Sequence, residues 1–128
     1  MIGHPLVSFF VAGRPIPKQS TRFVGGHAYT PRRVKDWQDA VTLEAFAAMV
    51  RQDQPLIVGE LDVKLVFCMP DRRRADCENL AKAVLDAMNK VVYHDDSQIV
   101  HLDITRTEGD NPGVRVTVGI WWAQMVDV

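Results

Sequence analysis

The spacing of hydrophobic residues along the chain predicts four main strands. Apolar and polar residues alternate between Leu61 and Met69, which is the period of a strand with one buried face, and Pro70 ends this stretch. The same alternation, or a richness in β-forming residues, predicts further strands at residues 5–13, 98–107 and 113–122.

Turn-forming residues join two pairs of extended segments. The sequence EGDNPG, at residues 108–113, predicts a closing hairpin in which the last two strands pair antiparallel. Residues 22–30 have the pattern of a separate tight hairpin, because Gly25 and Gly26 supply the positive φ angles that a two-residue turn requires. We expect the tip of this second hairpin to be exposed.

Two helices are predicted between the strands. Thr30 and Pro31 form an N-cap and first-position pair, and apolar residues then keep helical spacing to about Gln52. Asp76 is a good N-cap for the second helix. The apolar positions that define the two buried faces are Val34, Trp37, Val41, Ala45 and Ala48 in the first helix, and Leu80, Val84, Ala87, Met88 and Val91 in the second.

The order of these elements indicates an α/β (α+β) fold, with a mixed β-sheet and two main helices. At 128 residues and 47% hydrophobic content, we expect a single domain over residues 1–128. No apolar run approaches a membrane span, and the apolar start of the chain lacks the features of a signal peptide. Cys68 and Cys77 do not have the spacing of a disulfide framework or a zinc site. These features indicate a protein of the reducing cytoplasm.

Charged residues are distributed unevenly, although the formal net charge is only -1. The first 35 residues contain six basic residues and no acidic one. Arginines occupy positions 72–74, directly before Asp76 and Glu78, and two further carboxylates, Asp95 and Asp96, follow the second helix. A near-neutral total does not exclude a polyanionic partner, since binding depends on where the positive charge gathers.

The acidic residues have the composition of a magnesium site. Asp76 and Glu78 can converge above the helix N-terminus, and the later loop can bring back Asp95 or Asp96 if it folds over the same edge. Clustered carboxylates repel one another unless a cation lies among them, and Mg²⁺ binds few carboxylates together with phosphate oxygens. Lys82 lies one helical turn after Glu78, where it could neutralise charge on a phosphate.

Each of these residues also has a purely structural interpretation. Asp76 can be a simple N-cap, Glu78 can pair with Lys82 at i and i+4, and residues 94–98 can form an exposed turn. The joint pattern favours the functional interpretation, because arginines 72–74 would offset the repulsion between these carboxylates and a phosphate backbone.

The stretch MPDRRRADCENLAKAVLDAMNK, followed by DDSQIV, resembles the RusA family of Holliday junction resolvases over roughly Val63 to Arg106. The resemblance implies a small, homodimeric, Mg²⁺-dependent endonuclease with a mixed α/β fold, which cuts four-way DNA junctions by paired symmetric nicks in recombination and repair. Many members of this family are carried by prophages. We therefore expect a cytoplasmic protein of bacterial or phage origin that binds four-way junction DNA.

The resemblance also implies a role for particular residues. By this correspondence the catalytic residues are Asp76, Glu78, Lys82 and Asp96, and the metal ligands are Asp76, Glu78 and Asp96. The correspondence assigns DNA binding to Arg72, Arg73, Arg74 and Asn79. It also assigns DNA binding to Lys18, Ser20 and Arg22, which match the family only by their position in the loop after the first strand. Glu78 departs from the family pattern, which usually has aspartate at this position.

Two other functions fit the same residues. The chain could be a catalytically silent DNA-binding module, in which the change to Glu78 has cost activity. It could instead be a metal-dependent phosphohydrolase that acts on nucleotides, which would require an enclosed pocket, and the chain has no Gly-rich phosphate loop. For a homodimer, Trp121 or Trp122 could contribute to the interface.

Overall fold

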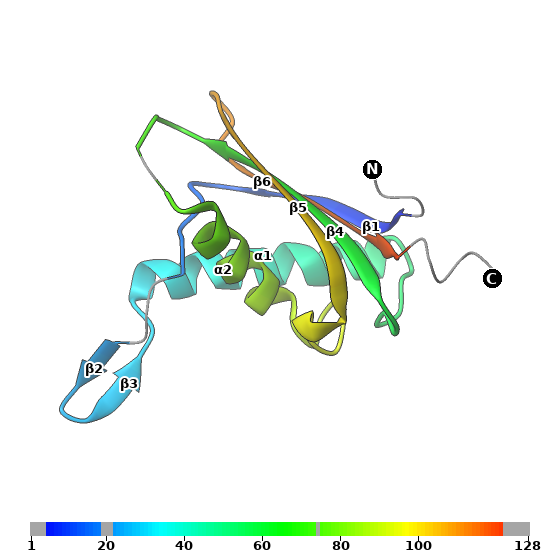
Figure 1. Ribbon diagram of the computed structural model, residues 1–128, viewed down its shortest axis with the longest axis horizontal. Helices are drawn as coiled ribbons and strands as arrows, with labels where there is room; N and C mark the ends of the chain where they lie inside the picture. The colour runs from blue at the N-terminus through cyan, green and yellow to red at the C-terminus, as the bar shows by residue number, and fades with distance from the viewer. Residues whose placement is uncertain (1–4, 19–21, 74, 122–128) are drawn as a thin grey trace.

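The computed structural model describes residues 5–18, 22–73 and 75–121, and its main feature is a four-stranded mixed sheet with two helices on one face (Figure 1). This architecture confirms the predicted α+β class. In chain order the elements are β1 (Pro5–Ala12), β2 (Arg22–Val24), β3 (His27–Tyr29), α1 (Arg32–Arg51), β4 (Leu61–Met69), α2 (Cys77–Met88), the 3-10 helix η1 (Asp96–Gln98), β5 (Ile99–Glu108) and β6 (Gly113–Ile120).

The strand order β1-β6-β4-β5 shows that the predicted closing hairpin is wrong. β5 pairs parallel with β4, whereas β6 pairs antiparallel with both β4 and β1. The turn after β5 crosses the end of β4, where the amide N of Gly109 donates to the carbonyl O of Met69 over 3.0 Å and Gly113 pairs with Cys68. Turn residues alone predict a change of direction, but they do not determine which strand becomes the neighbour.

The core lies between the sheet and the two helices. Every apolar position predicted for α1 is buried, and so are Leu80, Val84, Ala87 and Met88 of α2. Two side chains of α1 also fix α2 in place, because Gln38 Nε2 donates to the carbonyl O of Ala83 over 3.0 Å and Thr42 Oγ1 donates to the carbonyl O of Ala87 over 2.8 Å. The exposed face of α2 is therefore held in a fixed orientation.

The ends of the helices differ from prediction in two places. Pro31, not Thr30, is the N-cap of α1, because its ψ of 141° is extended, and this helix start has no side-chain cap. α2 begins after Asp76 as predicted but ends at Met88, before Val91. The chain reverses at Lys90, whose φ of 66° is left-handed, so Val91 packs against the core from a turn.

The short hairpin of β2 and β3 is confirmed. Val24 pairs with His27 across a two-residue turn, and Gly25 and Gly26 have φ angles of 56° and 81°. Figure 1 shows this hairpin extending away from the sheet and helices. None of the helices in the described part of the chain is long and apolar enough to cross a membrane.

Candidate active site

The N-terminal end of α2 is organised by Asp76. Its backbone is extended, and its Oδ1 accepts hydrogen bonds from the amide N of Glu78 at 2.8 Å and the amide N of Asn79 at 3.3 Å. The predicted N-cap is therefore confirmed. Glu78 lies exposed in the first turn, and among the ion pairs of the described residues none joins Glu78 to Lys82. The i, i+4 pair, which was the structural explanation for Glu78, does not form.

Arg106 is a cation at this end of α2 that the sequence interpretation missed. It comes from the edge strand β5, and its Nη1 donates to the carbonyl O of Ala75 over 2.8 Å. Together with Ala75, Asp76 and Cys77 it lines a shallow hollow of about 470 Å³. Arg106 is paired with Phe67, which places it on the helix side of the sheet. This pairing could not be used as a signal, because it depends on the parallel arrangement of β4 and β5, which the sequence did not predict.

The second half of α2 contributes Asp86, which the sequence interpretation also missed. The ammonium group of Lys18 forms an ion pair with the Asp86 carboxylate, and the amide N of Lys18 donates to the carbonyl O of Asn79 over 2.9 Å. Asp86 lies at i+4 from Lys82, so the two residues share one stripe of the helix, and this spacing is the signal that could have identified it. The loop after β1 is thus attached to the exposed face of α2.

The turn that carries Asp95 and Asp96 is pinned to the same half of α2. The buried Tyr93 donates from its hydroxyl to the carbonyl O of Leu85 over 2.7 Å. Gln98 Oε1 accepts from the amide N of Asp95 at 3.0 Å, while Gln98 Nε2 donates to the carbonyl O of Gly59 at 3.0 Å. These bonds fix the turn from both sides.

The two adjacent aspartates of this turn have opposite environments. Asp95 caps η1, and hydrogen bonds from the side chain and backbone of Ser97 lower the pKa of its carboxyl group. Burial raises the pKa of Asp96, and the negative charges of Asp95 and Asp86 and hydrogen bonding with Asp86 raise it further. Asp96 is therefore the member of the pair that faces α2, and its neighbour there is Asp86.

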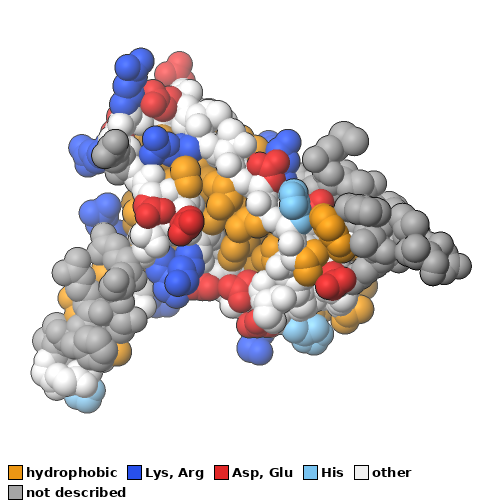
Figure 2. Space-filling model, viewed as in Figure 1, with side chains coloured by type: hydrophobic (Ala, Val, Ile, Leu, Met, Phe, Trp, Pro, Cys, Tyr) orange, Lys and Arg blue, Asp and Glu red, His pale blue; other side chains and the backbone are white. Residues whose placement is uncertain are grey.

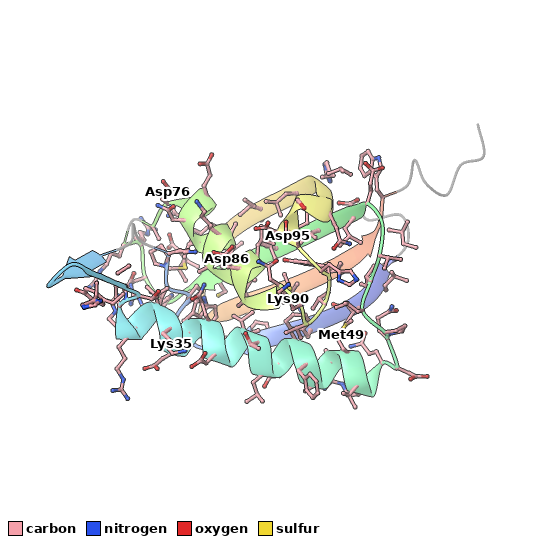
Figure 3. All side chains as sticks on the ribbon, turned by 90° about the horizontal axis from the view of Figure 1, so that it is seen from below. Lys35, Met49, Asp76, Asp86, Lys90 and Asp95 are labelled. Carbon is pink, nitrogen blue, oxygen red and sulfur yellow. The ribbon has the colours of Figure 1, made fainter. Side chains whose placement is uncertain are left out.

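The acidic residues thus form two groups along α2 (Figure 3). Asp86 follows Asp76 by ten positions, which corresponds to about 15 Å of helix. The structure does not bring Asp76, Glu78 and Asp96 together: within the described residues, no group of three His, Cys, Asp or Glu side chains is placed to hold a metal ion. The ligand assignment stays a prediction.

The second group differs from the first in having two carboxylates close together, one of which, Asp86, is already paired with the ammonium group of Lys18. The carboxylates of Asp86 and Asp96 face each other, and their repulsion contributes to the raised pKa of Asp96. A cation between two such groups would remove this repulsion, and Mg²⁺ is commonly held by one or two carboxylates. At the other end of the helix, Oδ1 of Asp76 is already occupied by backbone donors.

Of the predicted DNA-binding residues, Arg72 and Arg73 lie in the loop before α2 and Asn79 lies in its first turn. The side chain of Lys18 reaches further along the helix, to Asp86. Arg72 is almost fully exposed, with its Nε 3.5 Å from Oε2 of Glu108, and Arg73 is also exposed. Ser20 and Arg74 lie outside the described residues, and Arg22 begins β2. Figure 2 shows Lys and Arg side chains gathered toward the end of the molecule where both helices begin.

Trp121, Trp122 and the two cysteines are the other residues that the sequence analysis singled out. Trp121 stacks on His101 with ring centroids 5.6 Å apart, and Trp122 lies outside the described residues. Cys68 and Cys77 are free thiols, as the sequence predicts.

Comparison with known proteins identifies the family of the chain. Residues 12–119 match the family model described as Endodeoxyribonuclease RusA. The chain is 28% identical over 120 residues to the Crossover junction endodeoxyribonuclease RusA of Aquifex aeolicus (strain VF5), covering 88% of this chain and 90% of that protein. It is also 27% identical over 137 residues to the uncharacterized protein YqaN of Bacillus subtilis (strain 168), covering 88% of this chain and 94% of that protein. The chain therefore belongs to the RusA endodeoxyribonuclease family.

Proposed function

We propose that this protein is a Mg²⁺-dependent, structure-selective endonuclease that resolves four-way DNA junctions by paired symmetric nicks. Membership of the RusA family implies endodeoxyribonuclease activity, and the relative in Aquifex aeolicus carries the name of a crossover junction enzyme. The observation that carries the proposal is the exposed face of α2. Carboxylates lie at both of its ends, Lys18 reaches it, and an arginine-containing loop precedes it.

Each group on this face has a role in phosphodiester hydrolysis. Asp76, Glu78 and Asp96 are the proposed metal ligands, and Asp86 is close enough to Asp96 to share that task. A Mg²⁺ ion held by these carboxylates would supply a Lewis acid for the phosphoryl group. Lys82 neutralises negative charge that develops on the scissile phosphate.

The substrate geometry supports a dimer. Two nicks in strands of like polarity, placed symmetrically about a junction, call for two equivalent sites, which a twofold homodimer supplies. We expect sedimentation at micromolar concentration to give a dimer, either free or on a junction. A monomer in both conditions would contradict this part of the proposal. We place the protein in the cytoplasm of a bacterium, with its DNA substrate.

The test of the proposal uses a labelled immobile four-way junction and a linear duplex of the same sequence, each with and without Mg²⁺. We expect paired nicks in the junction alone, and only when Mg²⁺ is present. Asp76→Asn should abolish cleavage while leaving junction binding intact or tighter, because it removes a negative charge near the DNA. Asparagine is also a good N-cap, so this variant keeps the start of α2. Cleavage by Asp76→Asn at a near wild-type rate would refute the metal role of Asp76.

The arginine loop is tested separately, through the salt dependence of binding. Replacing Arg72, Arg73 and Arg74 with alanine should weaken junction binding and flatten its dependence on salt, since each lost phosphate contact lowers the log-log slope by about 0.9. A triple variant that keeps the full slope would place the DNA-binding surface elsewhere.

A further inference from the structure

Three arginines from separate segments surround a small hollow of about 110 Å³. Arg14 follows β1, Arg33 lies in the first turn of α1, and Arg73 lies in the loop between β4 and α2. Their convergence cannot be inferred from spacing along the chain, because it depends on how β1, α1 and β4 pack. The other residues that line the hollow are Pro15, Ile16, Pro17, Met69 and Ala75.

Asp71 positions two of these arginines. Its carboxylate accepts from Arg14 through both oxygens, with Nη1 to Oδ2 at 3.1 Å and Nη2 to Oδ1 at 3.3 Å. Its Oδ1 also accepts from the amide N of Arg73 at 2.9 Å. The hydrogen bond from Arg14, followed by that from Arg73, lowers the pKa of Asp71, so this carboxylate stays charged at neutral pH. Asp71 therefore orients the Arg14 guanidinium and fixes the backbone that carries Arg73.

Nearby carboxylates do not neutralise all the positive charge of the arginines around the hollow. Arg32 and Lys35 in the same turn of α1 form ion pairs one turn further on, with Asp36 at 3.7 Å and Asp39 at 3.6 Å. Within the part of the chain that the structure describes, the guanidinium groups of Arg33 and Arg73 have no such carboxylate partner.

Arg33 lies at a helix end that attracts an anion. The first turn of α1 contains no acidic residue, and the helix start has no side-chain cap. Unsatisfied amide groups give a helix N-terminus a partial positive charge, which repels a nearby cation and attracts an anion. A bound anion would therefore offset both the guanidinium charges and the charge of the helix end.

We propose that this hollow binds one phosphate of the DNA backbone outside the scissile bond, held by Arg14, Arg33 and Arg73. The planar fork of arginine suits bidentate contact with phosphate oxygens, and Arg33 and Arg73 are the two that can offer it, because the fork of Arg14 is bonded to Asp71. Ala75 lines this hollow and also the shallow hollow at Asp76, so the bound phosphate lies beside the candidate active site. The assignment adds Arg14 and Arg33 to the DNA surface, and it rests on the proposed action on DNA.

The test compares Arg33→Gln with Arg51→Gln. Arg51 is exposed in the last turn of the same helix, so the control removes an equal charge at the opposite end of α1. Binding to a four-way junction and to a linear duplex is measured over a range of salt concentrations, with a chelator present so that cleavage does not interfere. Arg33→Gln should weaken binding by about tenfold and lower the log-log slope by about 0.9. Arg33→Lys should recover the slope but not the full affinity, because it restores charge without the fork.

A second measurement identifies the phosphate itself. Single phosphates flanking the cut are replaced by neutral methylphosphonates, one at a time. One replacement should weaken binding by the wild type but not by Arg33→Gln, since both changes remove the same contact. Equal salt slopes for Arg33→Gln and Arg51→Gln would overturn the site, and so would methylphosphonate effects that are all additive with Arg33→Gln. If the wild type failed to prefer or cut the junction, the resolvase proposal would fall, while the slopes on linear duplex would still decide whether the hollow binds phosphate.

Discussion

Aspartate side chains have contrasting environments at the two ends of α2. At the N-terminal end, the Asp76 carboxylate accepts two backbone hydrogen bonds and completes the helix. Toward the C-terminal end, Asp96 faces Asp86, and burial together with neighbouring negative charge raises its pKa. A carboxylate satisfied by backbone donors contributes to folding, whereas carboxylates held against one another favour a cation. The second arrangement is the kind that concentrates at functional sites.

The contrast also holds within a single turn. Asp95 and Asp96 are adjacent, yet Asp95 caps η1 while Asp96 faces α2. The capping carboxylate and the candidate functional carboxylate are thus consecutive residues, and they can be removed one at a time. Matched substitutions at these positions test the comparison directly.

The largest effect is expected for Asp96→Asn. Removing this charge should lower the rate of junction cleavage by about 100-fold or more, as expected for the loss of a metal ligand or a close partner of one. Junction binding should be kept, because the substitution removes a negative charge from the DNA-facing side. The measurement is single-turnover cleavage in Mg²⁺, with binding assayed in a chelator.

Asp95→Asn is the control for this prediction. Asparagine still caps the 3-10 helix, so the turn keeps its shape and cleavage should remain within a few fold of wild type. Equal losses in Asp95→Asn and Asp96→Asn would show that the shape of the turn matters, and not the charge that faces α2.

Glu78 allows a test at the other end of the helix, with a smaller expected effect. It is exposed beside the cap, and its longer side chain stands where the family usually has aspartate. We expect Glu78→Asp to lower activity, because the shorter side chain would draw the carboxylate back from the position that Glu78 reaches, and Glu78→Gln to lower it much further by removing the ligand charge.

The three proteins are compared by single-turnover cleavage of a four-way junction in Mg²⁺. Higher activity in Glu78→Asp would mean that glutamate impairs this site. Equal rates in all three would exclude Glu78 as a ligand, and since it forms no ion pair with Lys82, a role in the first turn of α2 would be all that remained.

The fold could be predicted where side-chain periodicity carries the information. The buried faces of α1 and α2 follow from their apolar spacing, and the glycine pair of the β2–β3 hairpin follows from turn chemistry. Strand pairing could not be predicted from periodicity, because alternation is the same whichever strand lies alongside. In the structure, β5 is an edge strand with exposed residues on both faces, whereas Val114, Val116 and Val118 of β6 are buried.

Local features of the candidate site could be predicted from the sequence, but its geometry could not. The cap at Asp76 follows from local rules, and it was confirmed. The position of Asp96 depends on Tyr93 and Gln98, which attach its turn to α2 and to the segment before β4. Arg106 and Asp86 were missed because their neighbours come from distant segments, which only the packing of the sheet and the loops brings together.

The smallest expected effect is on stability, and it has opposite signs at Asp95 and Asp96. The pKa of Asp96 is raised, so between the ordinary value of about 3.9 and the raised value the folded protein binds more protons than the unfolded chain. Its contribution to the free energy of unfolding therefore falls as pH rises through that window. The pKa of Asp95 is lowered, so its stabilising contribution is present above the ordinary value and is lost as pH falls toward the folded value.

The contributions of Asp95 and Asp96 are distinguished by denaturant unfolding with a chelator present. The measurement covers about pH 3 to 7, which spans the ordinary aspartate pKa. Asp96→Asn should become more stable than wild type as pH rises through the window above the ordinary value, by less than about 1 kcal/mol because the site is largely solvated. Asp95→Asn should be less stable than wild type at neutral pH, and this difference should shrink as the pH falls. Asp86→Asn removes the same repulsion from the other side, but it also breaks the ion pair with Lys18, so it should gain less stability than Asp96→Asn. If Asp96→Asn and Asp95→Asn instead followed the same pH course, the two carboxylates would share one environment, and the functional distinction drawn between them would be wrong.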